Sequence, residues 1–252
     1  MDITINPRYE HLRPLILKLP ASNIVPDHVF CDNRNMVWQQ RLGDVDVVVK
    51  RFKRPTLINC FVYTYLRPNK GIRAYRNAMR LHSLGIDSPE PMACLVQKHH
   101  GLVHTVWFMS LFSPATTLHD AYLQSDGQVR EHLVKSYLDW AKNLLDHGVL
   151  QLDNNSRNTL VSLDADGNYH FALVDINRMR FVKHVTRKQA VAFFNCIYLN
   201  LPETFWLLHQ YTDIPEDQLQ DAMMQSIMIR KRRQMIINLK KPLKALIRKF
   251  KH

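Results

Sequence analysis

Two carboxylates and an amide surround a predicted β-hairpin in the second half of the chain, and their order constrains the fold more than any other feature. The segment QLDNNSRN places Asp153 five residues before Asn158. Two β-rich runs follow, Thr159–Leu163 and His170–Ile176, and the DADG between them is typical of a hairpin turn. Asp175 ends the apolar run FALVD in the second of them. The pattern predicts a polar loop, a hairpin and then a carboxylate.

These residue types suit phosphoryl transfer. That reaction needs a carboxylate to orient the attacking hydroxyl group, and an amide oxygen with a second carboxylate to hold magnesium against the phosphates. Protein kinases take the three groups from the loop H-R-D-x-x-x-x-N and from the aspartate of D-F-G. Asp153, Asn158 and Asp175 have the same order here. A solvated, Asn-rich loop is the alternative explanation of the first two, but the complete set favours a kinase site.

A lysine in the first part of the chain could complete such a site. Met36–Phe52 is predicted to form two strands joined at Gly43, and the second strand alternates so that Val48 and Lys50 share one face. In kinases a strand lysine pairs with the α- and β-phosphates of ATP. An exposed lysine in a basic stretch is the alternative. The position of Lys50 upstream of the polar loop favours the phosphate-binding interpretation.

Strands dominate the first part of the chain and helices the second. Met92–Val96 and Val103–Ser110 are predicted to pair as strands. Helical spacing predicts five helices, at Tyr75–Leu84, Leu118–Leu123, Gln128–His147, Lys188–Leu208 and Glu216–Met228. We therefore expect an α+β protein in three parts: a strand-rich lobe over residues 1–110, a helical lobe with the catalytic loop over 111–229, and a basic amphipathic tail over 230–252.

The positive charge is concentrated in that tail. The net charge is +12, but ten lysines and arginines and no acidic residue lie between Arg230 and His252, and the rest has 24 basic and 22 acidic residues. An interfacial helix on anionic lipid, a solvated face packed on the body and a nucleic-acid arm all fit this composition. Because the basic run is not interleaved with aromatic residues, we expect an anionic membrane surface as the partner and no nucleic acid.

Cysteine usage and apolar segments indicate the compartment. The four cysteines are widely spaced without a CxxC pair, so we expect free thiols, as in a reducing compartment. The first residues, MDITINPRYEHLRPL, have no basic start followed by an apolar core, and no apolar run approaches the roughly 18 residues that span a bilayer. We expect a cytoplasmic protein that is peripheral on the inner face of the cytoplasmic membrane.

Four runs of sequence carry a family resemblance: VVVKRFK from Val47, AYRNA from Ala74, LGIDSPEPMA from Leu84 and LVDINRMRF from Leu173. Together they resemble the bacterial lipopolysaccharide core kinases of the Kdo/heptose kinase type, a protein-kinase-like group. The resemblance extends from about Met36 to about Phe181. It implies a two-lobed kinase-like fold and an ATP- and magnesium-dependent phosphotransferase. The implied acceptor is a sugar hydroxyl on the Kdo or heptose inner core of a lipid A-linked molecule.

The resemblance also implies residue roles in catalysis. Asp153 corresponds to the catalytic aspartate, and Lys50 to the lysine that binds ATP phosphates. Asn158 and Asp175 correspond to the residues that hold magnesium.

Further roles concern the adenine of ATP. By the same resemblance Val48 lies above the adenine ring and Leu160 below it. The segment from Ser110 to Phe112 corresponds to the hinge, whose backbone reads the adenine edge.

Three departures from the family pattern leave a second hypothesis. The helix after the strand lysine normally carries a glutamate that pairs with it, but no Asp or Glu lies between positions 46 and 87, and Arg76 or a neighbour takes the expected place. Gln151 replaces the histidine two residues before the catalytic aspartate, and Ser156 and Arg157 replace a usual Pro-Gly. The alternative function is therefore a catalytically inactive, kinase-like binding protein at the membrane face.

Overall fold

The computed structural model describes residues 1–20 and 25–194, and positions 215, 218, 221, 224, 225, 227–229, 231, 232, 234–236, 238 and 239. The chain forms two compact units. Unit 1 is Met1–Ala121 with Asn158–Met179, and unit 2 is Tyr122–Arg157 with Arg180–His252. Within the described positions, no helix has both the length and the apolar character needed to cross a membrane.

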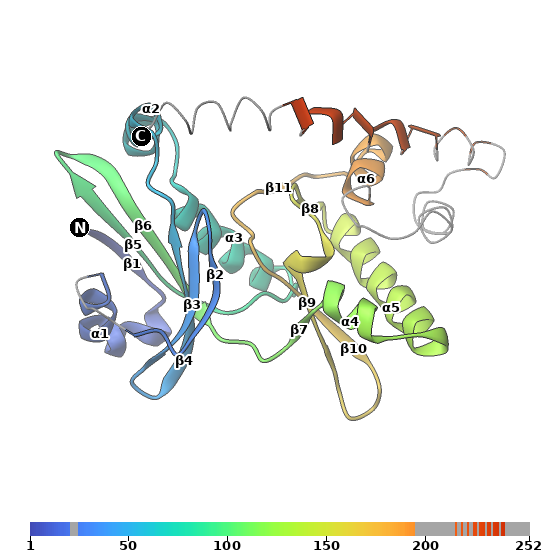
Figure 1. Cartoon of the computed structure of the whole chain (residues 1–252), viewed down its shortest axis with the longest axis horizontal. Coiled ribbons are helices and arrows are strands. Elements are labelled where there is room, and N and C mark those ends of the chain that lie inside the picture. The colour runs from blue at the N-terminus through green and yellow to red at the C-terminus, as the bar shows by residue number, and fades with distance from the viewer. Residues whose placement is uncertain are drawn as a thin grey trace. The chain divides into compact units, whose positions relative to one another are not determined.

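Unit 1 is built on an antiparallel sheet of six strands in the order β1–β5–β6–β4–β3–β2 (Figure 1). The strands are β1 (Asp2–Ile5), β2 (His28–Asp32), β3 (Met36–Leu42), β4 (Val45–Phe52), β5 (Pro91–His99) and β6 (Leu102–Leu111). Both predicted hairpins, β3–β4 and β5–β6, are present, with Gly43 and Gly101 at φ of 64° and 77° in their turns. The edge strands β1 and β2 are not predicted from the sequence.

Helices lie on both faces of this sheet. They are η1 (Pro7–Leu12) and α1 (Arg13–Lys18) on one face, and α2 (Leu57–Phe61), the π-helical turn η2 (Val62–Leu66) and α3 (Lys70–Ser83) on the other. Val47 and Val49 are fully buried in the cluster beneath α1, whereas Phe52 packs with Tyr75 of α3. The predicted alternation along β4 is therefore confirmed, and Lys50 lies on the face that α3 covers.

Helix α3 begins five residues before the predicted start. The Asn69 side chain accepts a backbone hydrogen bond and caps the helix. A methyl group added at Gly71 would come within 2.4 Å of Val106 and 2.7 Å of Cys94, so only glycine lets this first turn pack so closely on β5 and β6. Gly85, the predicted stop, has φ of 70° just after the helix. Helix α3 is thus fixed to the sheet at its start.

The predicted hairpin belongs to unit 1. It consists of β9 (Thr159–Leu163) and β10 (Tyr169–Leu173), and β7 (Thr116–Thr117) extends it to three strands. Strand β9 has the predicted bounds, but β10 ends at Leu173, so Asp175 lies two residues beyond the strand instead of at its end. The Val174 N–H donates to the carbonyl of Asn158 at 2.9 Å. That bond closes the base of the hairpin next to both proposed magnesium ligands.

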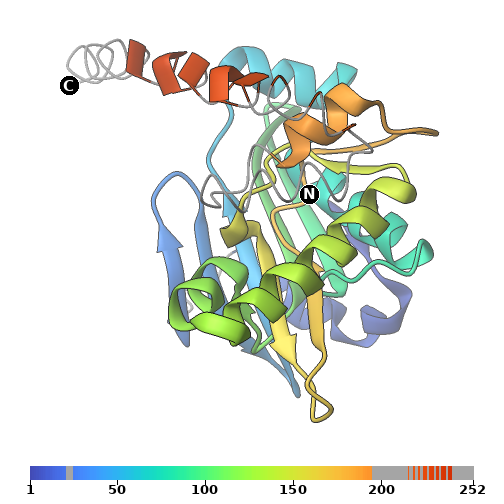
Figure 2. The same cartoon turned by 90° about the vertical axis from the view of Figure 1, so that its right-hand side faces the viewer.

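Unit 2 contains the long predicted helix and the polar loop. Its elements are the end of α4 (Leu118–Gln124), α5 (Gly127–Asp146), β8 (Val149–Gln151), most of β11 (Met179–Phe181) and α6 (Arg187–Phe194), and a 3₁₀ turn η3 (Ser156–Asn158) ends the loop. Figure 2 shows α5 as the long green helix. Gly148 ends α5 as predicted, at φ of 69°, and a methyl group there would meet the Val182 carbonyl oxygen at 1.9 Å. Glycine is therefore required where the chain enters β8.

The later predicted helices are described only in part. The helix predicted over 188–208 is confirmed as α6 up to Phe194, and its remainder lies outside the described residues. The described positions between 221 and 239 are helical, which covers part of the helix predicted over 216–228 and the first part of the tail. Positions 240–252 lie outside the described residues.

Candidate active site

The structure brings Lys50 and Asp175 together from positions 125 residues apart in the chain. The Lys50 Nζ lies 2.7 Å from Asp175 Oδ1, and the two side chains are 15% and 34% exposed. The same ammonium lies 5.5 Å from the centre of the Phe52 ring. A half-buried ion pair between a strand lysine and the carboxylate after the hairpin is therefore the centre of the candidate site.

The backbone of Asp175 has an unusual conformation. Its φ is 52°, and among the described non-glycine residues only His100 shares the left-handed region. Such a conformation costs roughly 1–3 kcal/mol and occurs preferentially at functional sites. The Asn177 side-chain amide also donates to Asp175 Oδ1. The Lys50 and Asn177 contacts thus end on the same carboxylate oxygen, and Oδ2 has no hydrogen-bond partner among the described residues.

Asn158 and Asp175 fit a magnesium ion by their donor types. Mg²⁺ prefers oxygen ligands and is usually bound by one or two carboxylates together with phosphates and water. The backbone carbonyl of Asn158 accepts a hydrogen bond from the residue that precedes Asp175, and the Asn158 side chain carries an amide oxygen. Within the described part of the chain, no group of three or more His, Cys, Asp or Glu residues could hold a metal by itself. A site of this kind would need phosphate oxygens to complete it.

Helix α3 contacts the segment that follows Asp175 through a side-chain amide instead of a carboxylate. Arg76 is exposed, whereas the Nδ2 of its neighbour Asn77 donates to the Ile176 carbonyl at 2.6 Å. Asn77 therefore links α3 to the residue that follows Asp175.

Lys70, the first residue of α3, lies in a cluster of positive charge. Burial lowers the pKa of the Lys70 ammonium below its ordinary value. The charges of Arg178, Arg34 and Lys50 lower this pKa further, and the Asp175 carboxylate partly offsets that lowering of the pKa. We call Arg34, Lys50, Lys70 and Arg178 the cationic cluster. Three other positive side chains and one carboxylate thus act on the Lys70 ammonium, an arrangement that suits a ligand with several negative charges.

Arg34 enters the cluster through a turn that sequence reasoning missed. It lies between β2 and β3 in the run DNRN, which contains no glycine. The Asn35 Oδ1 accepts a hydrogen bond from the Lys53 N–H at 3.1 Å, which ties this turn to the end of β4. The dipeptide Pro68-Asn69 signals the start of α3 and could have identified Lys70. For Arg34, the only local signal is the β-branched and aromatic pair Val29-Phe30, which favours a strand before the turn.

The residues proposed for adenine lie on β4, β6 and β9. Val48 is directly opposite Ser110 in the β4–β6 ladder, and Leu160 is opposite Thr117. The Phe112 N–H donates to the carbonyl of Asp46 at 2.9 Å, so this hinge amide is already engaged within the protein. The ring of Phe112 stacks on that of Phe30 from β2, with centres 6.3 Å apart. Phe30 is a second residue that sequence reasoning missed.

Asp153 lies in unit 2, in the loop between β8 and η3. It is half-buried, and its carbonyl accepts a hydrogen bond from the Asn155 side chain at 3.3 Å. The next residue, Asn154, is fully buried and donates to the Phe193 carbonyl on α6 at 3.2 Å. The Asn-rich loop is therefore a fixed structure anchored in unit 2. Four residues connect Asp153 to Asn158, which belongs to unit 1.

Comparisons with known proteins identify the family of this chain. Residues 31–196 match the model of the lipopolysaccharide kinase (Kdo/WaaP) family. A comparison with curated proteins finds no significant match. Among solved structures, the chain is similar to WaaP in complex with acyl carrier protein, with a TM-score of 0.61, 12% identity, and coverage of 92% of this chain and 98% of that chain.

A second solved structure, of WbdD, has a TM-score of 0.48 and 16% identity, and the match covers 82% of this chain and 47% of that one. The likeness to WaaP concerns the fold, a mixed arrangement of a strand-rich sheet and helices. The family match covers well over half of the sequence. The chain belongs to the lipopolysaccharide kinase (Kdo/WaaP) family.

Proposed function

We propose that this protein is an ATP- and magnesium-dependent kinase that phosphorylates a Kdo or heptose sugar of the lipopolysaccharide inner core. Family membership supports a kinase of the lipopolysaccharide core. The observation that carries the finer proposal is the ion pair between Lys50 and Asp175, because it unites a strand lysine with the carboxylate after the hairpin. The accepting group is an alcohol, a sugar hydroxyl of the lipid A-linked core.

In the proposed fold, two kinase-like lobes share the reaction. Residues 1–110 form the first lobe, residues 111–229 the second with its catalytic loop, and 230–252 the tail. Asn158 and Asp175 would hold magnesium, which neutralises charge on the phosphates as the phosphoryl group moves. Asp153 would orient the sugar hydroxyl and accept its proton as the hydroxyl oxygen bonds to the γ-phosphorus and ADP leaves.

The cationic cluster would take the place of two missing kinase features. The turn of Arg34 precedes β3 and β4, where kinases have a glycine-rich loop whose backbone amides contact the phosphates. Here a glycine-free turn would present an arginine side chain. Lys70 and Arg178 would add further charge to that of Lys50, so that phosphate binding would not depend on a lysine–glutamate pair. Asn77 would keep α3 in place.

Adenine would lie between Val48 and Leu160, beside the segment from Ser110 to Phe112. Since the Phe112 N–H is engaged with Asp46, the carbonyl oxygens of this segment are the groups that would read the adenine edge. Phe30 would extend the apolar surface offered to the ring through its stacking on Phe112.

A catalytically inactive binding protein is the second candidate. Two observations favour it: α3 carries no acidic residue, and Gln151 stands two residues before Asp153. The deciding experiment compares phosphate on the lipopolysaccharide core of native cells with and without this protein, by mass spectrometry of isolated core. We expect the core to lose one phosphate per molecule when the protein is absent. An unchanged core would favour the binding protein.

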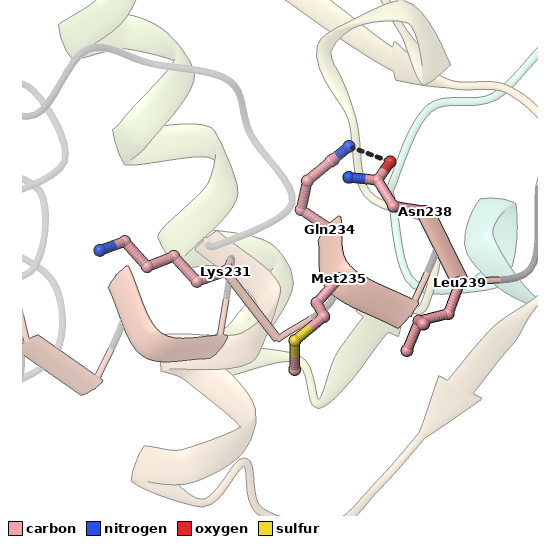
Figure 3. A pocket seen from close by; sticks show the side chains of 5 residues that line it. All are labelled: Lys231, Gln234, Met235, Asn238 and Leu239. Carbon is pink, nitrogen blue, oxygen red and sulfur yellow. Dashed lines mark hydrogen bonds between the residues drawn. The ribbon is translucent and has the colours of Figure 1, made fainter.

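The tail would hold the protein at the inner face of the cytoplasmic membrane. Of its described residues, Met235 and Leu239 are 58% and 68% exposed and point to one side of the helix, while Gln234 and Asn238 point to the other (Figure 3). The Gln234 side chain donates to Asn238 at 3.2 Å. Exposed apolar residues beside cations suit an anionic lipid surface. Because WaaP was solved with acyl carrier protein, such a carrier is the second candidate partner of this helix.

A further inference from the structure

An exposed apolar surface lies on the helical segment that connects β4, the strand of Lys50, to helix α3 along the chain. It is formed by five residues of the continuous helical segment α2–η2: Leu57, Ile58, Phe61, Tyr65 and Leu66. They are 79%, 79%, 53%, 65% and 72% exposed, respectively. The rings of Phe61 and Tyr65 lie 4.9 Å apart. Single exposed apolar residues are ordinary, but a contiguous group of this kind marks an interaction surface.

The opposite side of the same segment is firmly attached to unit 1. Cys60 is buried, and the Thr64 hydroxyl donates to its carbonyl at 2.7 Å. That hydroxyl also accepts a hydrogen bond from the Val103 N–H of β6 at 2.9 Å, and Tyr63 packs on the cluster beneath α3. The inner side of the segment is therefore held in unit 1, and its outer side exposes the five apolar residues together with Asn59. A helix with exposed apolar residues opposite its buried side has a second apolar surface available for an interface or a membrane.

The charged residues that flank this segment in the sequence are all of one sign. Arg51, Lys53 and Arg54 precede the segment and Arg67 follows it, and all four are exposed. No acidic residue lies between positions 46 and 87. Exposed cations around an apolar helix are attracted to anionic lipid headgroups, whereas an acidic residue among them would oppose that attraction.

The length of the segment decides how it could enter a bilayer. Its ten residues, 57–66, extend over about 15 Å as a helix, half of the roughly 30 Å hydrocarbon core. It can therefore lie along the interface but cannot span it. Phe61 and Tyr65 suit this position, since aromatic side chains are favoured at the level of the headgroups.

We propose that the α2–η2 surface docks unit 1 onto an anionic lipid bilayer, with the apolar side chains in the interface and the surrounding arginines and lysines on the headgroups. This contact is separate from the one proposed for the tail. It does not rest on phosphoryl transfer, because it requires neither ATP nor a sugar acceptor. If the protein is a core kinase, the same contact would hold its N-terminal lobe at the surface that carries the lipid-anchored substrate.

Flotation with vesicles tests the proposal on the full-length protein, without nucleotide or acceptor. The test protein carries Ile58→Gln, Phe61→Gln and Leu66→Gln, and the matched control carries Leu123→Gln, Val129→Gln and Leu163→Gln, which are similarly exposed elsewhere. On vesicles with about 30% anionic lipid we expect the test protein to partition at least five-fold more weakly than the control and the unsubstituted protein. Equal partition of all three would overturn the proposal.

A fluorescent probe reports the contact directly. Phe61→Trp should gain blue-shifted emission with anionic vesicles and lose intensity with brominated acyl chains, whereas Leu163→Trp should show neither change. No response of the Phe61→Trp protein to either lipid would contradict the proposal. Gln substitutions that altered only self-association in gel filtration would also contradict it, since a second copy of the chain would then be the partner.

Discussion

Lys70 shows at the scale of a single residue how binding and stability can oppose each other. A half-buried ammonium with three other cations around it is unfavourable until an anion arrives. Its lowered pKa has this cause. The arrangement costs stability in the free protein, the Asp175 carboxylate offsets part of that cost, and bound phosphates would offset more of it.

We therefore expect Lys70→Gln to change stability and binding in opposite directions. Without nucleotide, its melting temperature should equal or exceed that of the unsubstituted protein, because the repulsion is relieved. The affinity for Mg-ATP should fall about ten-fold, while the affinity for adenosine should change little, since Lys70 would contact phosphates only. Arg76→Gln, exposed on the same helix, is the control for calorimetric titration. An unchanged affinity for Mg-ATP would remove Lys70 from the phosphate site.

The site residues differ in how far they could be predicted. The Lys50–Asp175 pair follows from order along the chain, since a strand lysine and a carboxylate after a hairpin have a recurring spatial relation. The sequence marks the helix start at Lys70, but the approach of Lys70 and Arg34 to Lys50 does not follow from it, because that approach depends on where the helix start and a turn lie in the folded sheet. The sequence predicts only that Arg76 or a neighbour occupies the place of the missing glutamate, and the hydrogen bond of Asn77 to the Ile176 carbonyl could not be predicted from it.

At the scale of elements, periodic segments were predictable and short ones were not. β4, β9 and α5 have strong alternation or apolar stripes, and their bounds agree with prediction within one residue. β8 and β11 have three residues each and exist only because they pair with each other. The helix α2 was not predicted because its five residues are too few to give a periodic signal.

The link between α3 and the Asp175 segment gives an element-scale prediction. Asn77→Ala removes the 2.6 Å hydrogen bond to the Ile176 carbonyl. We expect a loss of about 1 kcal/mol in the free energy of unfolding and a several-fold lower phosphotransfer rate. Chemical denaturation and an ATP-turnover assay measure the two. Asn59→Ala, on the exposed side of α2, should change neither the stability nor the rate by a comparable amount.

The β9–β10 hairpin should lose stability in acid because of Asp164. Hydrogen bonds from His170 first, and then from the Asn168 backbone, lower the pKa of this carboxyl from 3.8 to about 2. Because the pKa of this carboxyl is lowered in the folded state, its ionised form stabilises the protein at pH values above the ordinary pKa. That contribution is lost as the pH falls through about 4 towards 2. In the Asp164→Asn protein, the melting temperature should therefore fall less steeply as the pH is lowered, so that the acid limb of its pH profile is flatter. An unaltered limb would contradict the assignment.

At the scale of the whole molecule, positive charge accumulates in two places, around α2–η2 and in the tail. A chain truncated before Arg230 loses ten basic residues and no acidic one. We expect it to bind anionic vesicles more weakly, and the binding of the full-length protein to weaken as salt rises. Flotation at two ionic strengths measures both. Equal partition of the full-length and truncated chains would exclude the tail as a membrane contact.

The residues proposed for the reaction are divided between the two units. Unit 1 holds Lys50, Asn158, Asp175 and the cationic cluster, and unit 2 holds Asp153. The residues proposed to bind nucleotide and metal therefore all belong to unit 1, whereas the residue proposed to orient the acceptor hydroxyl belongs to unit 2. Substitutions in the two units should affect different steps.

Phosphate transfer from Mg-ATP to a purified inner-core acceptor, measured together with ATP affinity, tests the central claim most directly. We expect transfer by the unsubstituted protein. Asp153→Asn should lower it at least about a hundred-fold with ATP affinity nearly unchanged, whereas Asp175→Asn should weaken Mg-ATP binding about ten-fold or more, because a metal-bound charge is lost. Asp166→Asn, in the exposed hairpin turn, is the control. Transfer that survives Asp153→Asn, or an unsubstituted protein that binds Mg-ATP yet phosphorylates no core acceptor, would contradict the account.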